Sequence, residues 1–319
     1  MLTAQDIRGM YAIIPTPALP GSEKWDADKT VDLEETSKLV NKLISDGVSG
    51  LIALGTTGEC ATLTTEEYMD FSKCVLSTNN QRIPCFIGAT ALGTHEVIKR
   101  LKFIEKEGAD GSLLGLPMWQ PLTKEMAVKF YRSVSEAFPK LAIMAYANAR
   151  AFRFNFDADF WGQVSENAST VTSAKFSNSQ ILMDALKATN NHINFIPIDS
   201  SVFEFYTLAQ DTTTACWATA ASMGPQPSIA LINAILNNDK GSAKIIAEDI
   251  NWANDIVDDI IRDPNLFASY NIQLEKARIS AAGYCNPGPV RPPYDFIPDE
   301  MLEKCKENGR RWAEICRKY

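Results

Sequence analysis

The sequence contains very little histidine and no cluster of metal-binding residues. Only His95 and His192 are present, and neither lies near a second histidine or a Cys-x-x-Cys pair. Protein zinc sites are built from such clusters. We therefore expect no metal ion, and both histidines are expected to have surface roles.

Long apolar runs and basic segments are also missing. No stretch approaches the roughly 20 apolar residues of a membrane-spanning helix. The first residues lack the cationic and apolar parts of a signal peptide. The net charge of -8 disfavours anionic partners. We expect no membrane and no nucleic acid partner.

Paired cysteine spacings are absent too. The 7 cysteines are odd in number and scattered along the chain, which indicates reduced thiols and a cytoplasmic protein. The hydrophobic fraction of 45% is typical of a globular protein with a sizeable core.

Short apolar runs alternate with amphipathic segments over the first two-thirds of the chain. The runs have the length and composition of strands that are buried on both faces. The predicted strands are Tyr11–Ile14, Gly50–Gly55, Pro84–Ala89, Gly111–Leu116, Leu141–Tyr146, Val171–Lys175, Asn194–Ile198 and Ala215–Ala220.

Capping-box patterns at Asp32–Glu35 and Thr64–Glu67 begin two of the intervening helices. Eight successive βα units predict an α/β fold, a closed (β/α)8 TIM barrel. An open doubly wound sheet is the alternative, but no GxGxxG follows the first strand.

The chain beyond Pro225 has helical patterns in place of strands. Helices are expected over 228–236, 242–261, 266–282 and 298–319. We predict a barrel carrying the active site over residues 1–225 and a helical appendage packed on it over 226–319. The 242–261 helix is expected to form either a subunit contact or ordinary cover for the core.

A lysine ends the sixth predicted strand and a tyrosine ends the fifth. Burial disfavours the charged form of Lys175, so the neutral amine becomes available as a nucleophile toward ketones. If the two strands are parallel neighbours, Tyr146 faces the same pocket. A nearby cation is expected to lower the pKa of Tyr146. Two alternatives remain open: Lys175 could form a buried ion pair with a carboxylate, and Tyr146 could serve only as a packing residue.

The turn Gly55-Thr-Thr-Gly58 follows the second predicted strand. Its N–H and hydroxyl groups can converge on a small carboxylate, which makes Thr56, Thr57 and Gly58 candidate substrate-binding residues. Glycine and threonine also serve turn geometry alone, so this motif by itself is weak. Glu59 is compatible with a catalytic, helix-entry or interface role.

Several motifs together resemble the dihydrodipicolinate synthase and N-acetylneuraminate lyase superfamily of class I pyruvate-dependent aldolases. Within it, the chain is most similar to the trans-o-hydroxybenzylidenepyruvate hydratase-aldolases of aromatic hydrocarbon catabolism. The resemblance runs nearly end to end and is carried by Thr30-Val-Asp-Leu-Glu-Glu-Thr36, Gly55-Thr-Thr-Gly-Glu-Cys-Ala-Thr-Leu-Thr64, Leu116-Pro-Met-Trp119, Tyr146-Ala-Asn148, Ala174-Lys175, Tyr270-Asn-Ile-Gln-Leu-Glu-Lys-Ala-Arg278 and Arg291-Pro-Pro-Tyr294.

The resemblance implies a role for each matching residue. Lys175 is expected to form the Schiff base and Tyr146 to relay protons, while Thr56 and Thr57 hold the pyruvyl carboxylate. The residues expected to shape the aryl end of the pocket and to position water are Trp119, Asn148 and Asn271. Departures from the family pattern are Ala149, where relatives often have proline, and Thr219-Ala-Ala-Ser222 after the eighth strand.

The function implied is cleavage of a trans-arylidenepyruvate to an aromatic aldehyde and pyruvate, without an external cofactor. Alternatives are a sialic-acid lyase-like or dihydrodipicolinate synthase-like aldolase, or a non-catalytic keto-acid-binding relative. The family resemblance further implies a homo-oligomer, either a tetramer or a trimer.

Overall fold

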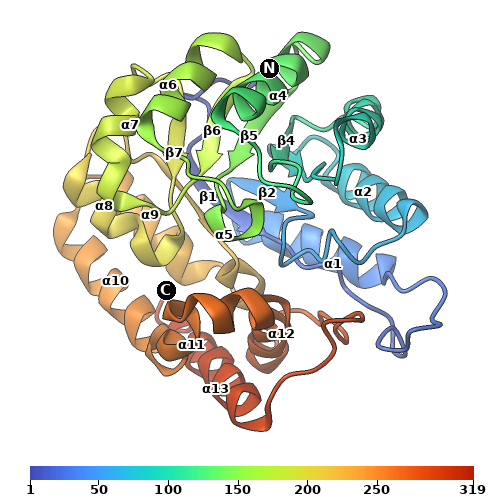
Figure 1. The fold of residues 1–319 in the computed structure, drawn as a ribbon. Coiled ribbons are helices and arrows are strands. Elements are labelled where there is room, and N and C mark those ends of the chain that lie inside the picture. The colour runs from blue at the N-terminus through green and yellow to red at the C-terminus, as the bar shows by residue number, and fades with distance from the viewer.

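The computed structural model describes residues 1–319 and contains one eight-stranded parallel sheet surrounded by helices (Figure 1). The strands are β1 (Gly9–Ile13), β2 (Gly50–Ala53), β3 (Cys85–Ile87), β4 (Gly111–Leu114), β5 (Ala142–Tyr146), β6 (Val171–Lys175), β7 (Asn194–Ile196) and β8 (Ala215–Ala218). All eight fall within the predicted runs or differ from them by at most two residues at the start.

The sheet closes on itself. Its order is β7-β6-β5-β4-β3-β2-β1-β8, and a parallel bridge between Ile198 and Trp217 joins the two end strands. The Trp217 N–H donates to the Pro197 carbonyl at 2.9 Å across this closure. The prediction of a (β/α)8 barrel is therefore confirmed, and the open doubly wound sheet is wrong.

Helices connect successive strands on the outside of the barrel. They are α1 (Leu33–Ser45), α2 (Thr65–Asn79), α3 (Thr94–Lys106), α4 (Lys124–Ala137), α6 (Ala158–Asn167), α7 (Leu182–Ala188) and α8 (Val202–Leu208). The short α5 (Ala149–Phe152), between β5 and α6, lies over the barrel mouth (Figure 1). Thr64 and Glu67 form the predicted reciprocal capping box of α2. Asp32 caps α1, but Glu35 accepts instead from the Asn286 N–H, so the predicted box is half formed.

The chain after β8 is helical: α9 (Gln226–Leu236), α10 (Lys240–Asn254), α11 (Asp258–Arg262), α12 (Pro264–Ala282) and α13 (Asp299–Cys316). Helix α9 contacts β1 and β8. It therefore occupies the place of the eighth barrel helix, whereas the sequence-based division at residue 225 puts it in the appendage. The single helix expected over 242–261 is wrong, because a 3-10 turn at Asp255–Val257 separates α10 from α11.

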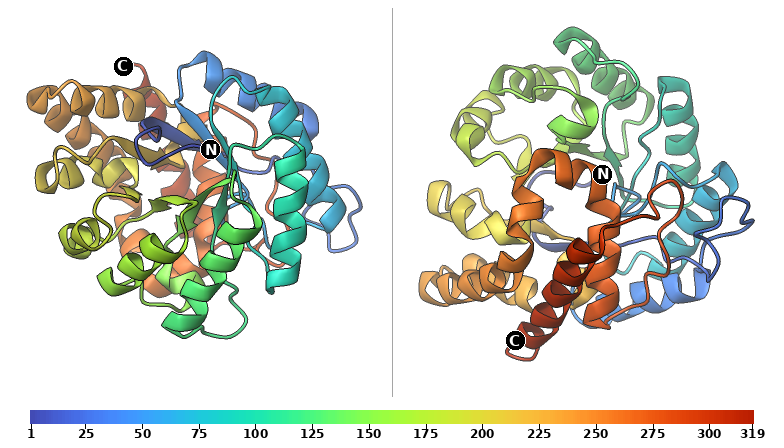
Figure 2. Two further views of the ribbon diagram at one scale, coloured as in Figure 1. Left: turned by 90° about the horizontal axis from the view of Figure 1, so that it is seen from above. Right: turned by 60° about the horizontal axis from the view of Figure 1, so that its bottom comes forward.

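Helices α12 and α13 pack side by side beneath the barrel in Figure 1, and Figure 2 shows the pair from two further directions. Trp312 and Ile315 of α13 belong to the barrel's hydrophobic core. A smaller apolar cluster joins α11, α12 and α13 to one another. The C-terminal helices are thus anchored on the barrel. No helix combines the length and apolar character needed to span a membrane.

Candidate active site

Lys175 and Tyr146 end neighbouring strands and lie directly opposite each other in the register of β5 and β6. The predicted parallel pairing of these strands is confirmed. The carboxyl ends of barrel strands carry the chemistry in enzymes with this fold. The Lys175 Nζ atom lies 4.6 Å from the centroid of the Tyr146 ring.

The Lys175 amine lies between aromatic rings. Its Nζ atom is 3.3 Å from the centroid of the Trp217 ring, and no carboxylate lies within ion-pair distance of it. Burial lowers the pKa of Lys175 to about 7, the charge of Glu275 opposes this shift, and Arg150 adds to it. A large fraction of the amine is therefore unprotonated at neutral pH, which is the nucleophilic form.

Tyr146 is held by two hydrogen bonds at its hydroxyl. Thr56 Oγ1 lies at 3.0 Å and the Asn148 side-chain amide donates at 3.2 Å. Burial raises the pKa of Tyr146, although both hydrogen bonds act in the opposite direction. The expected lowering by a cation is therefore wrong, because desolvation disfavours the phenolate. At neutral pH Tyr146 is therefore a protonated phenol, the form that can donate a proton.

Asn148 fixes this arrangement from the start of α5. Its Oδ1 atom accepts from the Ala151 N–H at 3.1 Å as an N-cap, while its Nδ2 atom donates to Tyr146. Both ends of the amide are thus used within the protein. Ala149, the departure from the family pattern, opens the short helix that this cap begins.

The threonine turn is shaped by close backbone contact. A Cβ at Gly58 would lie 2.7 Å from the Leu54 nitrogen, so no larger residue fits there. The Gly58 carbonyl accepts from Thr16 Oγ1 at 2.7 Å. Gly58 does not line the cavity that contains Lys175, whereas Thr56 and Thr57 do.

A cavity of about 460 Å³ opens beside Lys175. Six residues predicted as site residues line it: Thr56, Thr57, Tyr146, Asn148, Lys175 and Asn271. Trp119 does not line this cavity, and it is 77% exposed. The polar, charged and aromatic wall residues that the sequence did not single out are Arg150, Ser177, Trp217, Phe267 and Glu275, while Thr219 belongs to the segment that departs from the family pattern. Trp217 could have been identified from the sequence, because it is an aromatic residue near the carboxyl end of the eighth strand.

An apolar cavity of about 190 Å³ adjoins the first and shares Thr56, Tyr146 and Asn271 with it. Its remaining walls are mostly hydrophobic and include Cys60, Met118, Phe152, Ile272 and Tyr294. This combination of an apolar chamber with a few polar groups at one edge is typical of sites for small organic ligands.

Two buried polar atoms at the cavity have no hydrogen-bond partner, the Asn271 Oδ1 acceptor and the Trp217 Nε1 donor. Buried polar atoms without a partner are rare in folded proteins, and each calls for an explanation. Asn271 follows a kink in α12 at Tyr270, and both Asn271 and Glu275 of the second half of the helix line the cavity. A substrate or a water molecule can satisfy both atoms.

Helix α12 also brings paired charges to the cavity wall. Glu275 receives two hydrogen bonds of 2.8 Å from the Arg278 guanidinium, which also donates to Thr219 Oγ1 at 2.7 Å. Thr219 belongs to the segment that departs from the family pattern. Because Arg278 occupies both Glu275 oxygens, Lys175 has no free carboxylate partner on this side.

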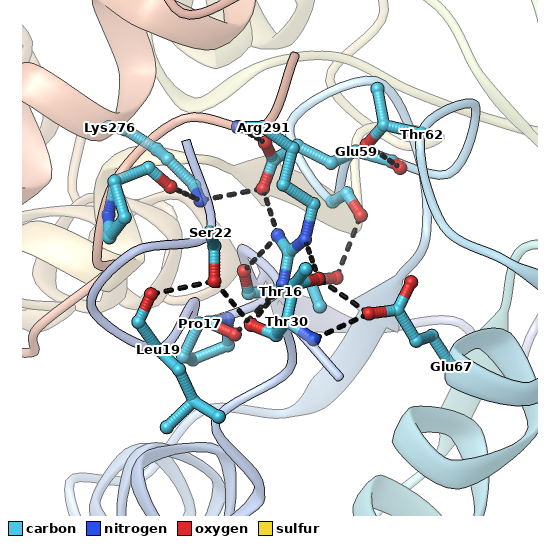
Figure 3. Close-up of polar contacts among 12 residues, drawn as sticks. Thr16, Pro17, Leu19, Ser22, Thr30, Glu59, Thr62, Glu67, Lys276 and Arg291 are labelled. Carbon is cyan, nitrogen blue, oxygen red and sulfur yellow. Dashed lines mark hydrogen bonds and ion pairs between the residues drawn. The ribbon is translucent and has the colours of Figure 1, made fainter. Parts of the chain in front are cut away.

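A second buried cluster lies behind the threonine turn and consists of Glu59, Lys276 and Arg291 (Figure 3). Lys276 Nζ lies 2.6 Å and Arg291 Nη1 2.5 Å from the same Glu59 oxygen. Arg291 also donates to the Thr16 and Thr30 carbonyls. Glu59 thus anchors the turn to the C-terminal region, and it lines the apolar cavity but not the one that contains Lys175.

Comparison with known proteins finds relatives over the whole chain. A family model described as "Dihydrodipicolinate synthetase family" matches residues 20–307. The trans-O-hydroxybenzylidenepyruvate hydratase-aldolase of Pseudomonas aeruginosa is 39% identical over 100% of this chain and 96% of its own length. The trans-2'-carboxybenzalpyruvate hydratase-aldolase of Nocardioides sp. is 36% identical over the same shares. A solved structure described as "PhdJ bound to substrate intermediate" gives a TM-score of 0.95 at 32% identity, covering 100% of this chain and 99% of that one.

Proposed function

The chain belongs to the dihydrodipicolinate synthetase family, and from this premise we propose that it is a hydratase-aldolase acting on a trans-arylidenepyruvate, such as trans-o-hydroxybenzylidenepyruvate. The products are an aromatic aldehyde and pyruvate. The resemblance stated from the sequence is confirmed, and the enzyme class is that of a carbon–carbon lyase. The observation that carries the proposal is the Lys175 amine, which has no acidic partner and faces a ligand-sized cavity.

The reaction begins at the ketone carbon of the substrate. The neutral Lys175 amine attacks this carbon to give a carbinolamine, which takes up a proton and loses water as an iminium forms. Tyr146 supports this step because its hydroxyl is protonated and held between Thr56 and Asn148. It donates a proton to the departing hydroxyl and recovers one afterwards, so no external cofactor is needed.

Water then adds to the carbon that bears the aryl group. The iminium withdraws electrons through the conjugated alkene, which makes that carbon electrophilic and converts the nitrogen end to an enamine. Protonation of the enamine carbon gives a β-hydroxy iminium. In this proposal the attacking water donates a hydrogen bond to the Asn271 Oδ1 atom, which is supported by the lack of a partner for that atom within the protein.

The final step breaks the carbon–carbon bond. The new hydroxyl loses its proton, the aldehyde carbonyl forms, and the bonding electrons pass into the iminium to give the enamine of pyruvate. Protonation and hydrolysis then release pyruvate and regenerate Lys175. Microscopic reversibility lets the same groups catalyse condensation of an aldehyde with pyruvate.

The two ends of the substrate need different surroundings. Thr56 and Thr57 line the cavity at the turn and supply hydroxyl groups for the pyruvyl carboxylate. The adjoining apolar cavity, with Met118, Phe152 and Ile272 in its walls, suits an aromatic ring. Trp119 stays a prediction for the aryl end, because its side chain is exposed.

Borohydride reduction with pyruvate, followed by mass mapping, tests the proposal directly. The expected result is a stable adduct on Lys175 and on no other lysine, and its absence would leave only a keto-acid-binding role. Turnover with substituted benzaldehydes, compared with N-acetylmannosamine, separates the hydratase-aldolase from a sialic-acid lyase-like enzyme. A cytoplasmic location and a trimer or tetramer are further proposals, the latter testable by light scattering.

A further inference from the structure

The indole of Trp217 lies directly against the Lys175 nitrogen. The distance from Nζ to the ring centroid is 3.3 Å, well inside the roughly 6 Å range of cation–π contacts. Trp217 is 7% exposed, and its strand is fixed by pairing with β1 at Tyr11 and by the bridge to Ile198. The position of the ring is therefore set by the barrel itself.

The charge of this nitrogen changes during the reaction. A neutral amine, a ketone and a proton combine to give an iminium and water, so the nitrogen carries a positive charge in the iminium, the form that activates the substrate. An aromatic face attracts a cation but not a neutral amine. We propose that Trp217 stabilises the iminium form of Lys175, which deepens the Schiff-base function proposed above and depends on it.

The other groups near the Lys175 nitrogen are less suited than Trp217 to stabilise the iminium. From α12, Glu275 attracts a positive charge, but both of its oxygens already accept from Arg278. From α5, Arg150 disfavours a positive charge on Lys175. From β5, the Tyr146 ring lies farther away, at 4.6 Å. The indole is thus the nearest group that favours a cation without being charged itself.

This role has a distinctive dependence on pH. Below the pKa of the free amine, both the ammonium and the iminium are cations, so the indole stabilises both and its effect on pyruvate binding cancels. Above that pKa the free amine is neutral, so the indole stabilises only the iminium. Loss of the indole should therefore weaken covalent pyruvate binding at high pH and leave it almost unchanged at low pH.

The test uses Trp217→Leu and Trp217→Phe in the full chain. Equilibrium binding of pyruvate is measured by borohydride trapping at pH 6 and pH 9, on either side of the Lys175 pKa of about 7. We expect about tenfold weaker binding at pH 9 for the leucine variant, a smaller loss for phenylalanine, and little loss at pH 6 for either. Trp252→Leu, which removes a surface indole near Arg311, is the matched control and should change neither value.

Each outcome has one meaning. Equal losses at pH 6 and pH 9 would overturn the proposal in favour of simple packing. Binding that changes at neither pH would also overturn it, because the indole would then contribute nothing to the covalent complex. No adduct in the unmodified protein would instead overturn the Schiff-base function, and the role of Trp217 with it. Burial lowers the pKa of Lys276 to about 8. Because Lys276 titrates alike in every variant, its effect cancels in the ratio of variant to unmodified binding at each pH. If Trp217→Leu does not fold, Trp217→Phe carries the same test.

Discussion

Glu59 accepts hydrogen bonds from both the main-chain N–H and the guanidinium of Arg291, a residue 232 positions further along the chain. The first contact is 2.9 Å and the second 2.5 Å. Because Glu59 follows the threonine turn directly, the geometry of that turn depends on the C-terminal segment. The barrel and the C-terminal segment therefore form one structural unit at this point.

Replacing Glu59 with glutamine should destabilise the protein strongly. The substitution leaves Lys276 and Arg291, each 2% exposed, without their shared carboxylate. Removing one partner of a buried ion pair costs about 3–5 kcal/mol, because the remaining charge stays desolvated. Urea denaturation measures the change. Lys124→Met, which breaks the ion pairs to Asp157 and Asp159 nearer the surface, should cost much less. Similar losses for the two variants would contradict this interpretation of the cluster.

Replacing Lys175 with methionine should stabilise the fold at low pH. Burial lowers the pKa of Lys175 from 10.5 to about 7, so the folded state binds this proton less tightly than the unfolded state. Each tenfold change in proton affinity corresponds to about 1.4 kcal/mol. The gain is therefore up to about 5 kcal/mol below pH 7, and it shrinks as the pH rises toward 10.5.

Thermal melting at a series of pH values checks this expectation. The control is Lys129→Met, at an exposed position on α4, which should show no such trend. A gain for Lys175→Met that is the same at pH 6 and pH 10 would show that its pKa is not lowered in the folded protein.

The value of kcat/KM should rise with pH and level off above about 7. The free enzyme must supply a neutral amine, and burial lowers the pKa of Lys175 to that value. Burial raises the pKa of Tyr146 above its ordinary value of 10.0, so the alkaline loss of activity should lie above pH 10. Initial rates over pH 5–10 with a saturating and a limiting substrate concentration give the profile.

Tyr146→Phe separates the two groups in this profile. It should lower the plateau by about 10²–10⁴-fold, the usual contribution of a general acid–base group, and keep the rise at the same pH. A rise that moves with this substitution would assign the titration to the tyrosine.

The juxtaposition of Lys175 and Tyr146 could be predicted from the sequence because it depends on local information. Lys175 and Tyr146 each end a short apolar run, and neighbouring strands of a barrel bring such ends together. The hydroxyl contact to Thr56 follows from the same rule, since its turn comes directly after β2.

The remaining walls depend on how distant segments dock. Glu275 lines the cavity because α12 docks against α5 and the turn after β8, and no periodic pattern encodes that docking or the kink at Tyr270. The pKa of Tyr146 shifts opposite to expectation because desolvation outweighs its neighbours, and desolvation depends on the whole fold. Trp119 lies in a connecting segment after β4, where strand position gives no information about side-chain direction.

Asn271→Leu should impair water addition more than carbon–carbon bond cleavage. Leucine is similar in size but lacks the Oδ1 acceptor, which has no partner within the protein. Misplacing a reactant commonly costs about 10²-fold in rate.

With benzaldehyde and pyruvate, carbon–carbon bond formation comes first and loss of water second, so the Asn271→Leu variant should accumulate the β-hydroxy keto acid. Mass spectrometry detects that intermediate, while ultraviolet absorbance follows the conjugated product. Ser177→Ala, another polar wall residue, is the control and should give no accumulation. Equal slowing of both steps in Asn271→Leu would mean that Asn271 orients the substrate as a whole and does not hold the water.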